Sequence, residues 1–182
     1  MEKLRNFVKE KLSDELKIIL SSWRNDSLND YLNIWEKAII YKYSNDGFKE
    51  LNLILRNSNG AIIPEFGEFL KNSLNKLPNF ADVVYRGVNL SENEIEKYLK
   101  LYKEKSIFTE NTFISATKSK NIAYQHGNGV FRIISKKGKD VEQLSKHQKE
   151  KEVLFCCNSN FKVLNLQKDI YGKGVFITLK EI

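Results

Sequence analysis

The chain has 182 residues, a formal net charge of +7 and a sequence pI near 9.2. Apolar residues make up 41% and charged residues 29%, which is typical of a globular protein and excludes an extended disordered chain. Only 2 prolines are present and no Pro-, Ser- or Gly-rich tract divides the chain. We therefore expect one domain over residues 1–182, mainly helical in residues 1–80 and mainly β in residues 81–182.

The basic balance favours acidic partners, such as nucleic acid, phosphate groups or an acidic protein face. Six basic residues and no acid lie between Lys118 and Lys139, although a solvated basic face would give the same pattern. Residues 1–20 are too charged for a signal peptide, and no apolar run approaches the ~20 residues of a membrane span. We expect no membrane partner. The expected site of action is the cytoplasm, either of the producing cell or of a host cell into which the protein is delivered.

The two cysteines are adjacent, at Cys156 and Cys157. Neighbouring side chains on a strand point to opposite faces, so we expect free thiols and a reducing compartment. Together with His126 and His147 they lack the usual spacing of a zinc site, so we expect no metal.

Four amphipathic helices are predicted in the first part, because apolar residues recur there at three- and four-residue steps. Ser27 or Asn29 is the expected cap of the second helix, and Pro64 fits the first turn of the fourth. A turn at residues 44–47 is expected between the second and the third. The expected helices cover residues 4–23, 28–39, 48–55 and 64–77.

The pattern changes at Asp82, after which short apolar runs alternate with polar segments. Ser91 and Glu94 form a capping box for a helix that runs to about Tyr102. Helices followed by strands predict an α+β fold with a mainly antiparallel sheet. The expected strands cover residues 83–86, 112–117, 129–134, 152–156, 161–166 and 175–179.

Two carboxylates, Glu150 and Glu152, stand at the start of the apolar run Val153–Phe155. On a strand they would project from the same face, roughly 7 Å apart at ~3.4 Å per residue. Such a pair is a candidate for acid–base or electrostatic catalysis. Two solvated glutamates at the start of a strand are the ordinary alternative, since exposed Glu is common.

Three short pieces of the second part carry a stronger signal together than separately. They are Tyr85-Arg86-Gly87, Phe113-Ile114-Ser115-Ala116-Thr117 and Glu150-Lys151-Glu152-Val153-Leu154. In this order and at these spacings they resemble the mono-ADP-ribosyltransferase toxins of the Arg-Ser-Glu class. The match extends upstream to Tyr43, Phe48, Asn52, Leu55 and Arg56, and further on to Ala123-Tyr124 and Phe131-Arg132-Ile133. The resemblance covers residues 38–180.

The resemblance implies two packed, mainly antiparallel sheets around an NAD cleft. It implies that NAD is a substrate, cleaved between nicotinamide and ribose through an oxocarbenium-like transition state, with no metal needed. Glu152 would then stabilise the developing positive charge, and Ser115 would orient it by hydrogen bonding. Arg86 would hold phosphate or ribose with its planar fork of donors. The other implied NAD contacts are Gly87, Thr117, Tyr124, Tyr43 and Asn52.

The first acid of the pair is expected to select the acceptor. The resemblance implies arginine, because arginine-directed members have Glu at the position of Glu150 and asparagine-directed members have Gln. A carboxylate pairs with a guanidinium and helps to remove its proton, whereas an amide does not. The expected partner is therefore an unidentified protein with an accessible arginine.

The residues that carry the resemblance also have ordinary alternatives. Arg86 is also read as a surface cation, and Ser115 and Thr117 as plain strand hydroxyls. Tyr124 is also read as a core residue, and Asn52 as a capping or turn partner.

The chain departs from the family pattern at Gly127, where several relatives carry an arginine. Lys118 or Lys120 is a candidate replacement, and this choice stays open. The loop before the acid pair offers only His147 where many relatives have an aromatic residue, so the sequence names no target.

Four functions stay open at this stage. They are an arginine-directed protein ADP-ribosyltransferase, an NAD glycohydrolase, a transferase with a nucleic-acid acceptor, and a non-catalytic binding module with the same fold. The intact set of Arg86, Ser115, Glu150 and Glu152 favours the enzymes. A sugar glycosidase is a distant fifth, since its chemistry does not require Arg86.

Overall fold

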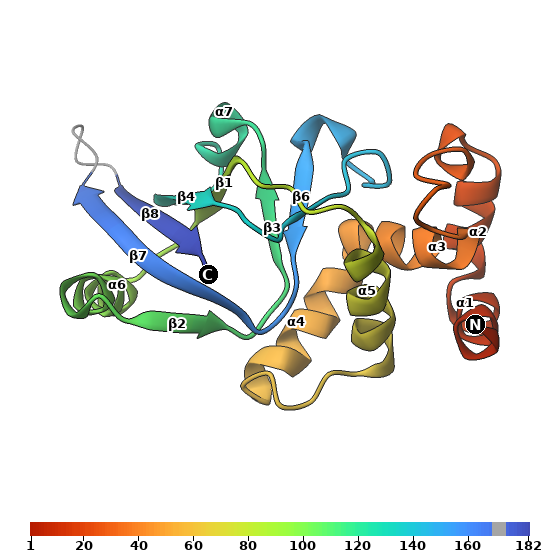
Figure 1. Ribbon diagram of the computed structural model, residues 1–182, viewed down its shortest axis with the longest axis horizontal. Coiled ribbons are helices and arrows are strands. Elements are labelled where there is room, and N and C mark those ends of the chain that lie inside the picture. The colour runs from red at the N-terminus through yellow and green to blue at the C-terminus, as the bar shows by residue number, and fades with distance from the viewer. Residues whose placement is uncertain (169–173) are drawn as a thin grey trace.

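The computed structural model describes residues 1–168 and 174–182, and places the helices before most of the strands (Figure 1). The first part contains α1 (Glu2–Lys11), α2 (Ser13–Leu20), η1 (Trp23–Asn25), α3 (Ile34–Lys42), η2 (Tyr43–Gly47), α4 (Phe48–Asn57) and α5 (Glu65–Lys76). No helix among the described residues is long and apolar enough to cross a bilayer.

The single long helix expected between Leu4 and Trp23 is wrong. Leu12 has φ −131° and ψ 33°, which lies outside the helical region and separates α1 from α2. The break lets Leu4 and Val8 from α1, Leu12 itself and Ile19 from α2 all reach the core. Trp23 lies beyond α2 in the short η1 and is half-exposed.

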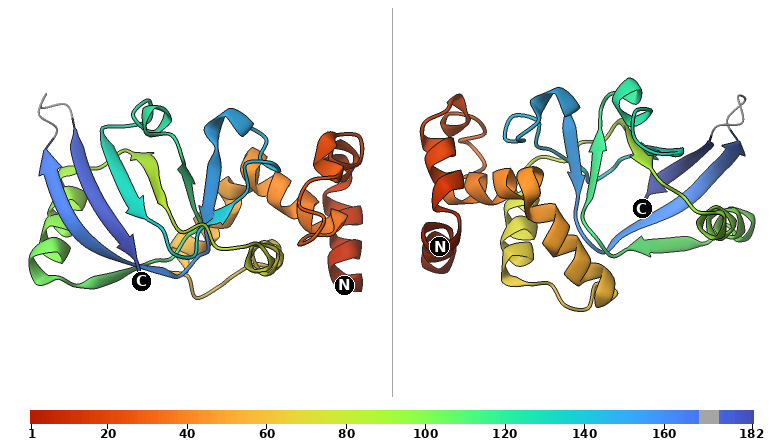
Figure 2. Two further views of the ribbon diagram at one scale, coloured as in Figure 1. Left: turned by 45° about the horizontal axis from the view of Figure 1, so that its top comes forward. Right: turned by 180° about the vertical axis from the view of Figure 1, so that it is seen from behind.

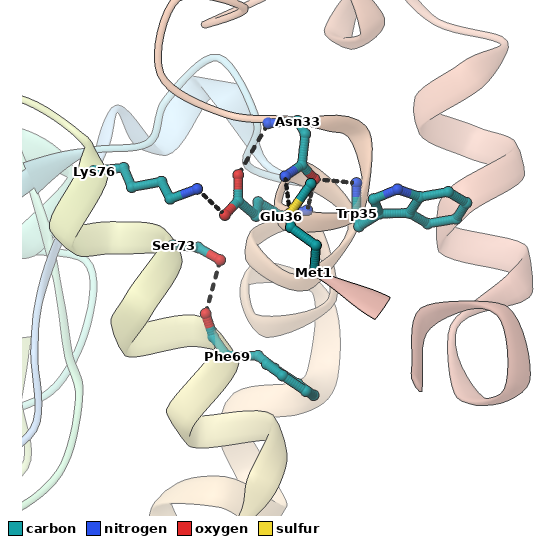
Figure 3. Close-up of polar contacts among 7 residues, drawn as sticks. All are labelled: Met1, Asn33, Trp35, Glu36, Phe69, Ser73 and Lys76. Carbon is teal, nitrogen blue, oxygen red and sulfur yellow. Dashed lines mark hydrogen bonds and ion pairs between the residues drawn. The ribbon is translucent and has the colours of Figure 1, made fainter. Parts of the chain in front are cut away.

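The cap of α3 is Asn33, so the expected caps Ser27 and Asn29 are wrong. The Asn33 side chain accepts hydrogen bonds from the N–H groups of Trp35 and Glu36 (Figure 3). The Glu36 carboxylate accepts from the Asn33 N–H in return, at 3.0 Å. Such a box satisfies helix-end donors that would otherwise stay unpaired.

The turn expected at residues 44–47 is also wrong. Residues Tyr43–Gly47 form one π-helical turn that joins α3 directly to α4. The wider turn buries Tyr43, and its last residue, Gly47, has Phe66 of α5 so close that a Cβ would lie 3.0 Å from the ring. The fourth predicted helix is confirmed as α5, although Pro64 is its N-cap and not a residue of its first turn as expected.

The second part contains β1 (Val83–Val88), α6 (Glu92–Glu104), β2 (Ile107–Glu110), β3 (Ile114–Thr117), α7 (Lys120–Ala123), β4 (Gly129–Ile134), β5 (Lys139–Asp140), η3 (Gln148–Glu150), β6 (Glu152–Phe155), β7 (Ser159–Lys168) and β8 (Val175–Glu181). The capping box of Ser91 and Glu94 is confirmed. The short strands β2 and β5 were not predicted, and β3 begins two residues later than expected.

In the part of the chain that the structure describes, eight strands are hydrogen-bonded in the order β2-β7-β8-β4-β1-β3-β6-β5. All neighbours are antiparallel except β4 and β8, which confirms the α+β class and the mainly antiparallel sheet. Strands β1 and β3 share one register pair, Tyr85 with Thr117, so the expected two sheets appear as two sections joined at that point. Figures 1 and 2 show the two sections diverging from each other.

The buried apolar residues form two clusters. One lies among α1 to α5 and includes Phe113, the residue before β3, and Leu154 of β6. The other lies between the larger section and α6 and includes Val153 and Phe155 of β6. Successive residues of β6 therefore face different clusters, as the alternation of a strand requires. Strand β6 is therefore packed between the helices and the larger sheet section, and Glu152 lies at its start.

Candidate functional site

Glu152 is the first residue of β6 and is only 5% exposed. Strand β3 lies beside it, with Thr117 as its register partner. The Ser115 hydroxyl donates to Oε1 of Glu152 at 2.6 Å, and the Ser145 hydroxyl donates to Oε2 at 2.8 Å. Both oxygens of this carboxylate are therefore fixed in place. The predicted contact between Ser115 and Glu152 is present.

The surroundings of Glu152 raise its pKa above the usual range of a glutamate. Burial is the largest cause, because a charged carboxylate loses hydration. The two serine hydrogen bonds oppose the shift, since they favour the ionised form. The charge of Glu150 adds to the increase and His147 lowers it. A carboxylate perturbed by burial and by a second acid is a common sign of a functional site.

Glu150 does not lie on the strand, so the expected strand pair is wrong. It ends the short η3 turn and is exposed. Lys151 follows in the left-handed conformation, with φ 49° and ψ 53°, and redirects the chain into β6. Glu150 and Glu152 nevertheless line the same two cavities. The structure thus brings the pair together by a turn and not by strand alternation.

Arg86 lies on β1, and its Nη1 donates to the backbone carbonyl of Ser115 at 2.8 Å. This bond crosses the junction between the two sheet sections. It holds the guanidinium in the cavities that Ser115 and Glu152 also line. Gly87 follows, and a Cβ there would lie 2.2 Å from the carbonyl of His126 and 2.3 Å from that of Ala123. The glycine is therefore required for the segment after β3 to pack against β1.

Three cavities meet around Arg86. One of about 300 Å³ is lined by Gly87, Thr117 and His126, and one of about 380 Å³ by Tyr43, Asn52 and His147; both also touch Ser115 and the acid pair. A third, of about 410 Å³, extends from Arg86 and Gly87 to Arg56 and Glu110. Volumes of this size suit small ligands, and adjoining cavities suit an extended one.

Tyr43 and Asn52 form a fixed wall of the second cavity. The Asn52 amide accepts from the N–H of Phe113 at 3.1 Å and donates to its carbonyl at 3.1 Å. The Tyr43 hydroxyl donates to the same carbonyl at 3.3 Å. Asn52 is therefore not a capping residue: it ties α4 to the backbone two residues before Ser115.

Tyr124 does not join this group. It is 50% exposed, which makes the core alternative wrong, and it lines a separate cavity of about 450 Å³ with Gly127 and Phe176. The ammonium of Lys120 lies over both aromatic rings, 5.5 Å and 5.6 Å from their centroids. Thr117 does line the first cavity, and its hydroxyl accepts from the Ser119 N–H at 3.0 Å.

Lys118 makes two ion pairs, with Asp140 at 2.7 Å and Glu142 at 2.6 Å. Its charge is therefore already neutralised, and it is a poor substitute for the arginine that Gly127 replaces. The thiols of Cys156 and Cys157 are free, and burial raises the pKa of Cys156 to about 11. In the described part of the chain, no cluster of three or more His, Cys, Asp or Glu side chains is arranged to hold a metal ion.

Sequence reasoning missed Ser145 as a partner of Glu152. The residue lies seven positions before Glu152 in a polar segment, with no periodic pattern to indicate which way its side chain points. Its burial, at 1% exposure, is unusual for a serine in a loop and is the structural sign of its contact.

A protein-family model described as NAD:arginine ADP-ribosyltransferase matches residues 40–182. The putative NAD(+)--arginine ADP-ribosyltransferase Mav of Mycobacterium avium (strain 104) is 32% identical over 136 residues, which cover 72% of this chain and 16% of that protein. The chain spans between 16% and 59% of the length of the curated relatives that it matches.

Two solved structures have the same fold. ADP-ribosyltransferase HopU1 of Pseudomonas syringae pv. Tomato DC3000 superposes with a TM-score of 0.82 at 20% identity, covering 93% of this chain and 87% of that one. The type III effector XopAI of Xanthomonas axonopodis pv. citri superposes with a TM-score of 0.75 at 19% identity, covering 98% and 80%.

Proposed function

Because this chain belongs to the NAD:arginine ADP-ribosyltransferase family, we propose that it cleaves NAD and transfers ADP-ribose to an arginine of a target protein. The observation that carries the proposal is the arrangement of the acid pair. Glu152 is buried and held by two hydroxyls, and Glu150 is exposed on the same cavities. This arrangement supports a role for Glu152 in bond cleavage and for Glu150 in contact with an acceptor.

In the proposed reaction the bond between the nicotinamide nitrogen and ribose C1′ breaks, and its electron pair leaves with nicotinamide. The ribose gains oxocarbenium character, which a fixed negative charge stabilises. Each oxygen of Glu152 already accepts one serine hydroxyl and keeps a second lone-pair site. The carboxylate can therefore bind a ribose hydroxyl without losing its own supports.

The acceptor step needs a group that binds a guanidinium and removes a proton. Glu150 is the candidate, because it is exposed and lines both cavities that Glu152 lines. A guanidinium nitrogen of the target attacks C1′, a new N–C1′ bond forms, and the released proton passes to the Glu150 carboxylate and then to water.

The remaining residues would bind NAD. Arg86 borders all three cavities, so it is placed to contact phosphate or ribose in an extended dinucleotide. Gly87 and Thr117 would line the nicotinamide side, and Tyr43 and Asn52 the opposite wall. Tyr124 lies outside these cavities, so we assign it no contact with NAD.

The target protein is proposed only as one with an accessible arginine. The likeness to a type III effector supports action inside a recipient cell after delivery. We also propose that residues 1–182 act as one domain, which the hydrogen bond from Arg24 to the Ser145 carbonyl supports, because it joins the first helices to the site.

The test is nicotinamide release from NAD, with and without agmatine as acceptor. The native chain should release nicotinamide and label agmatine, and Glu152→Ala should lower release by about 10²–10³-fold, as expected for loss of a preorganised electrostatic contact. Glu96→Ala, which changes an exposed glutamate of α6, is the matched control. Release without labelling would favour an NAD glycohydrolase or another acceptor. No release from folded protein would contradict the proposal.

A further inference from the structure

Ser145 connects the site to a part of the molecule that precedes the family match. That match begins at residue 40, whereas Arg24 lies in η1. Nη2 of Arg24 donates to the backbone carbonyl of Ser145 at 3.0 Å. The Ser145 hydroxyl in turn donates to Glu152 at 2.8 Å. A chain of two hydrogen bonds therefore runs from the N-terminal helices to the buried carboxylate.

The direction of the Ser145 hydroxyl is set by its own neighbours. The N–H of His147 donates to Oγ of Ser145 at 3.3 Å, so the oxygen acts as an acceptor there. The hydroxyl proton is then free to point at Glu152 Oε2. Because the side chain is 1% exposed, water does not compete for this bond.

Arg24 is itself held in place by aromatic rings. Its guanidinium lies 5.4 Å from the ring centroid of Trp23 and 5.3 Å from that of Tyr41. Cation–π contact with the two rings favours this position of the guanidinium, from which it reaches the Ser145 carbonyl. A second anchor lies next to it, where the Lys146 N–H donates to the Ser44 hydroxyl at 2.8 Å. The segment between β5 and β6 is thus fastened to the helices on one side (Figure 1).

We infer that Ser145, anchored by Arg24, is a positioning residue that fixes the second carboxylate oxygen of Glu152. Ser115 fixes the first oxygen from β3, so the carboxylate is held from two independent elements. With only one hydroxyl, the group would be free to rotate about its last bond. The segment of α1, α2 and η1 thereby contributes to the site through Arg24, although none of its residues lines these cavities.

The effect of Ser145 on NAD cleavage rests on the proposed function. The positioning of the Glu152 carboxylate does not, because it can be measured directly. The pKa of Glu152 can be followed by ¹³C NMR of glutamate side chains, with the signal assigned by its loss in Glu152→Gln. The other titratable or charged side chains that line cavities with Glu152 are kept unchanged; they are Tyr43, Lys49, Tyr85, Arg86, His126, His147 and Glu150.

Ser145→Ala should raise the pKa of Glu152 by about one to two pH units, because a hydrogen bond to the charged form is lost. Ser73→Ala is the matched control: Ser73 is equally buried, but its hydroxyl donates to the Phe69 carbonyl within α5 (Figure 3). That variant should leave the pKa of Glu152 unchanged. The acid limb of the pH profile of nicotinamide release should move with the NMR value.

Arg24→Ala should cause a smaller increase, and no further increase when Ser145→Ala is already present, because the two residues act in series. An unchanged pKa of Glu152 in Ser145→Ala would overturn the inference. If Ser145→Ala does not fold, an unchanged pKa of Glu152 in Arg24→Ala would do the same. Additive effects of the two changes would overturn the role of Arg24. If the pKa moves as expected while the native chain releases no nicotinamide, the positioning stands and the proposed function fails.

Discussion

The two acids of the site lie two residues apart in the sequence and in very different surroundings. Glu152 begins a strand, is buried, and has a hydroxyl on each oxygen. Glu150 ends a short turn and is exposed. Bond cleavage needs a charge that is fixed before the substrate arrives, whereas contact with a large acceptor needs access. Under the proposed function, the buried surroundings of Glu152 and the turn that carries Glu150 would therefore have separable tasks.

The variant Glu150→Gln tests most directly whether the two acids have separate roles. Transfer to agmatine should fall by about 10²–10⁴-fold, because an amide does not take the proton of the guanidinium. Nicotinamide release should fall much less, because Glu152 and its two serines are unchanged. Both rates are measured on the same preparation by nicotinamide quantification and by mass spectrometry of agmatine. An equal loss of both rates would show that the two acids do not have separate roles.

A change at Asn52, which forms one side of the cavity with Tyr43, should instead lower the stability and also both rates, nicotinamide release and transfer to agmatine. Asn52→Ala removes an amide that satisfies the buried N–H and carbonyl of Phe113. We expect a loss of about 2–3 kcal/mol in the free energy of unfolding and a fall in Tm of about 5–10 °C. Calorimetry and urea titration measure this.

Asn72→Ala, on the exposed side of α5, is the control for that variant. The control should unfold within about 0.5 kcal/mol of the native chain, as surface substitutions usually do. If Asn52→Ala were no more destabilising than the control, the hydrogen bonds between Asn52 and Phe113 would not stabilise this side of the cavity.

The smallest expected effect concerns pH. Folding raises the pKa of Glu152, so the native state holds a proton that the unfolded chain releases, and stability falls as pH rises between the two values. Glu152→Gln removes this penalty. Its Tm should exceed that of the native chain by a few degrees at pH 8, and the difference should shrink as the pH falls toward the unfolded value of ~4.3.

Glu96→Gln serves as the control in the same scan, because Glu96 is an exposed residue of α6 and its change should leave Tm within about 1–2 °C at every pH. A Glu152→Gln variant that is less stable than the native chain at pH 8 would show that burial does not dominate the surroundings of Glu152.

Sequence reasoning succeeded where a local pattern carries the structure. The strand at residues 129–134 matches β4 at both ends, and the capping box of Ser91 and Glu94 opens α6 as predicted. It failed where tertiary packing overrides the pattern. The periodicity between Leu4 and Trp23 continues through Leu12, although the helix breaks there so that both parts reach one core. The edge strand β5 has only 2 residues, too few to give a pattern, and the edge strand β2 has no fully buried side chain to mark one of its faces.

The site shows the same division. The residue types of the site were predicted from three motifs, and the structure brings Arg86, Ser115, Glu150 and Glu152 together. The prediction that Glu150 lies on the same strand as Glu152 was wrong. Lys151 has a left-handed backbone conformation, which a lysine in the sequence does not indicate. Ser145 was missed for a related reason: its contact is made across a turn, where neither helical nor strand spacing applies.

The left-handed conformation of Lys151, with φ 49° and ψ 53°, bears on how the motif tolerates sequence change. A position that requires positive φ accepts Gly, Asn or Asp readily, whereas β-branched residues are strained there. The middle residue of Glu-x-Glu is therefore constrained by backbone handedness and not by side-chain chemistry. A chain carrying Val or Ile at this position would need another path into β6, and its two glutamates would no longer converge by this turn.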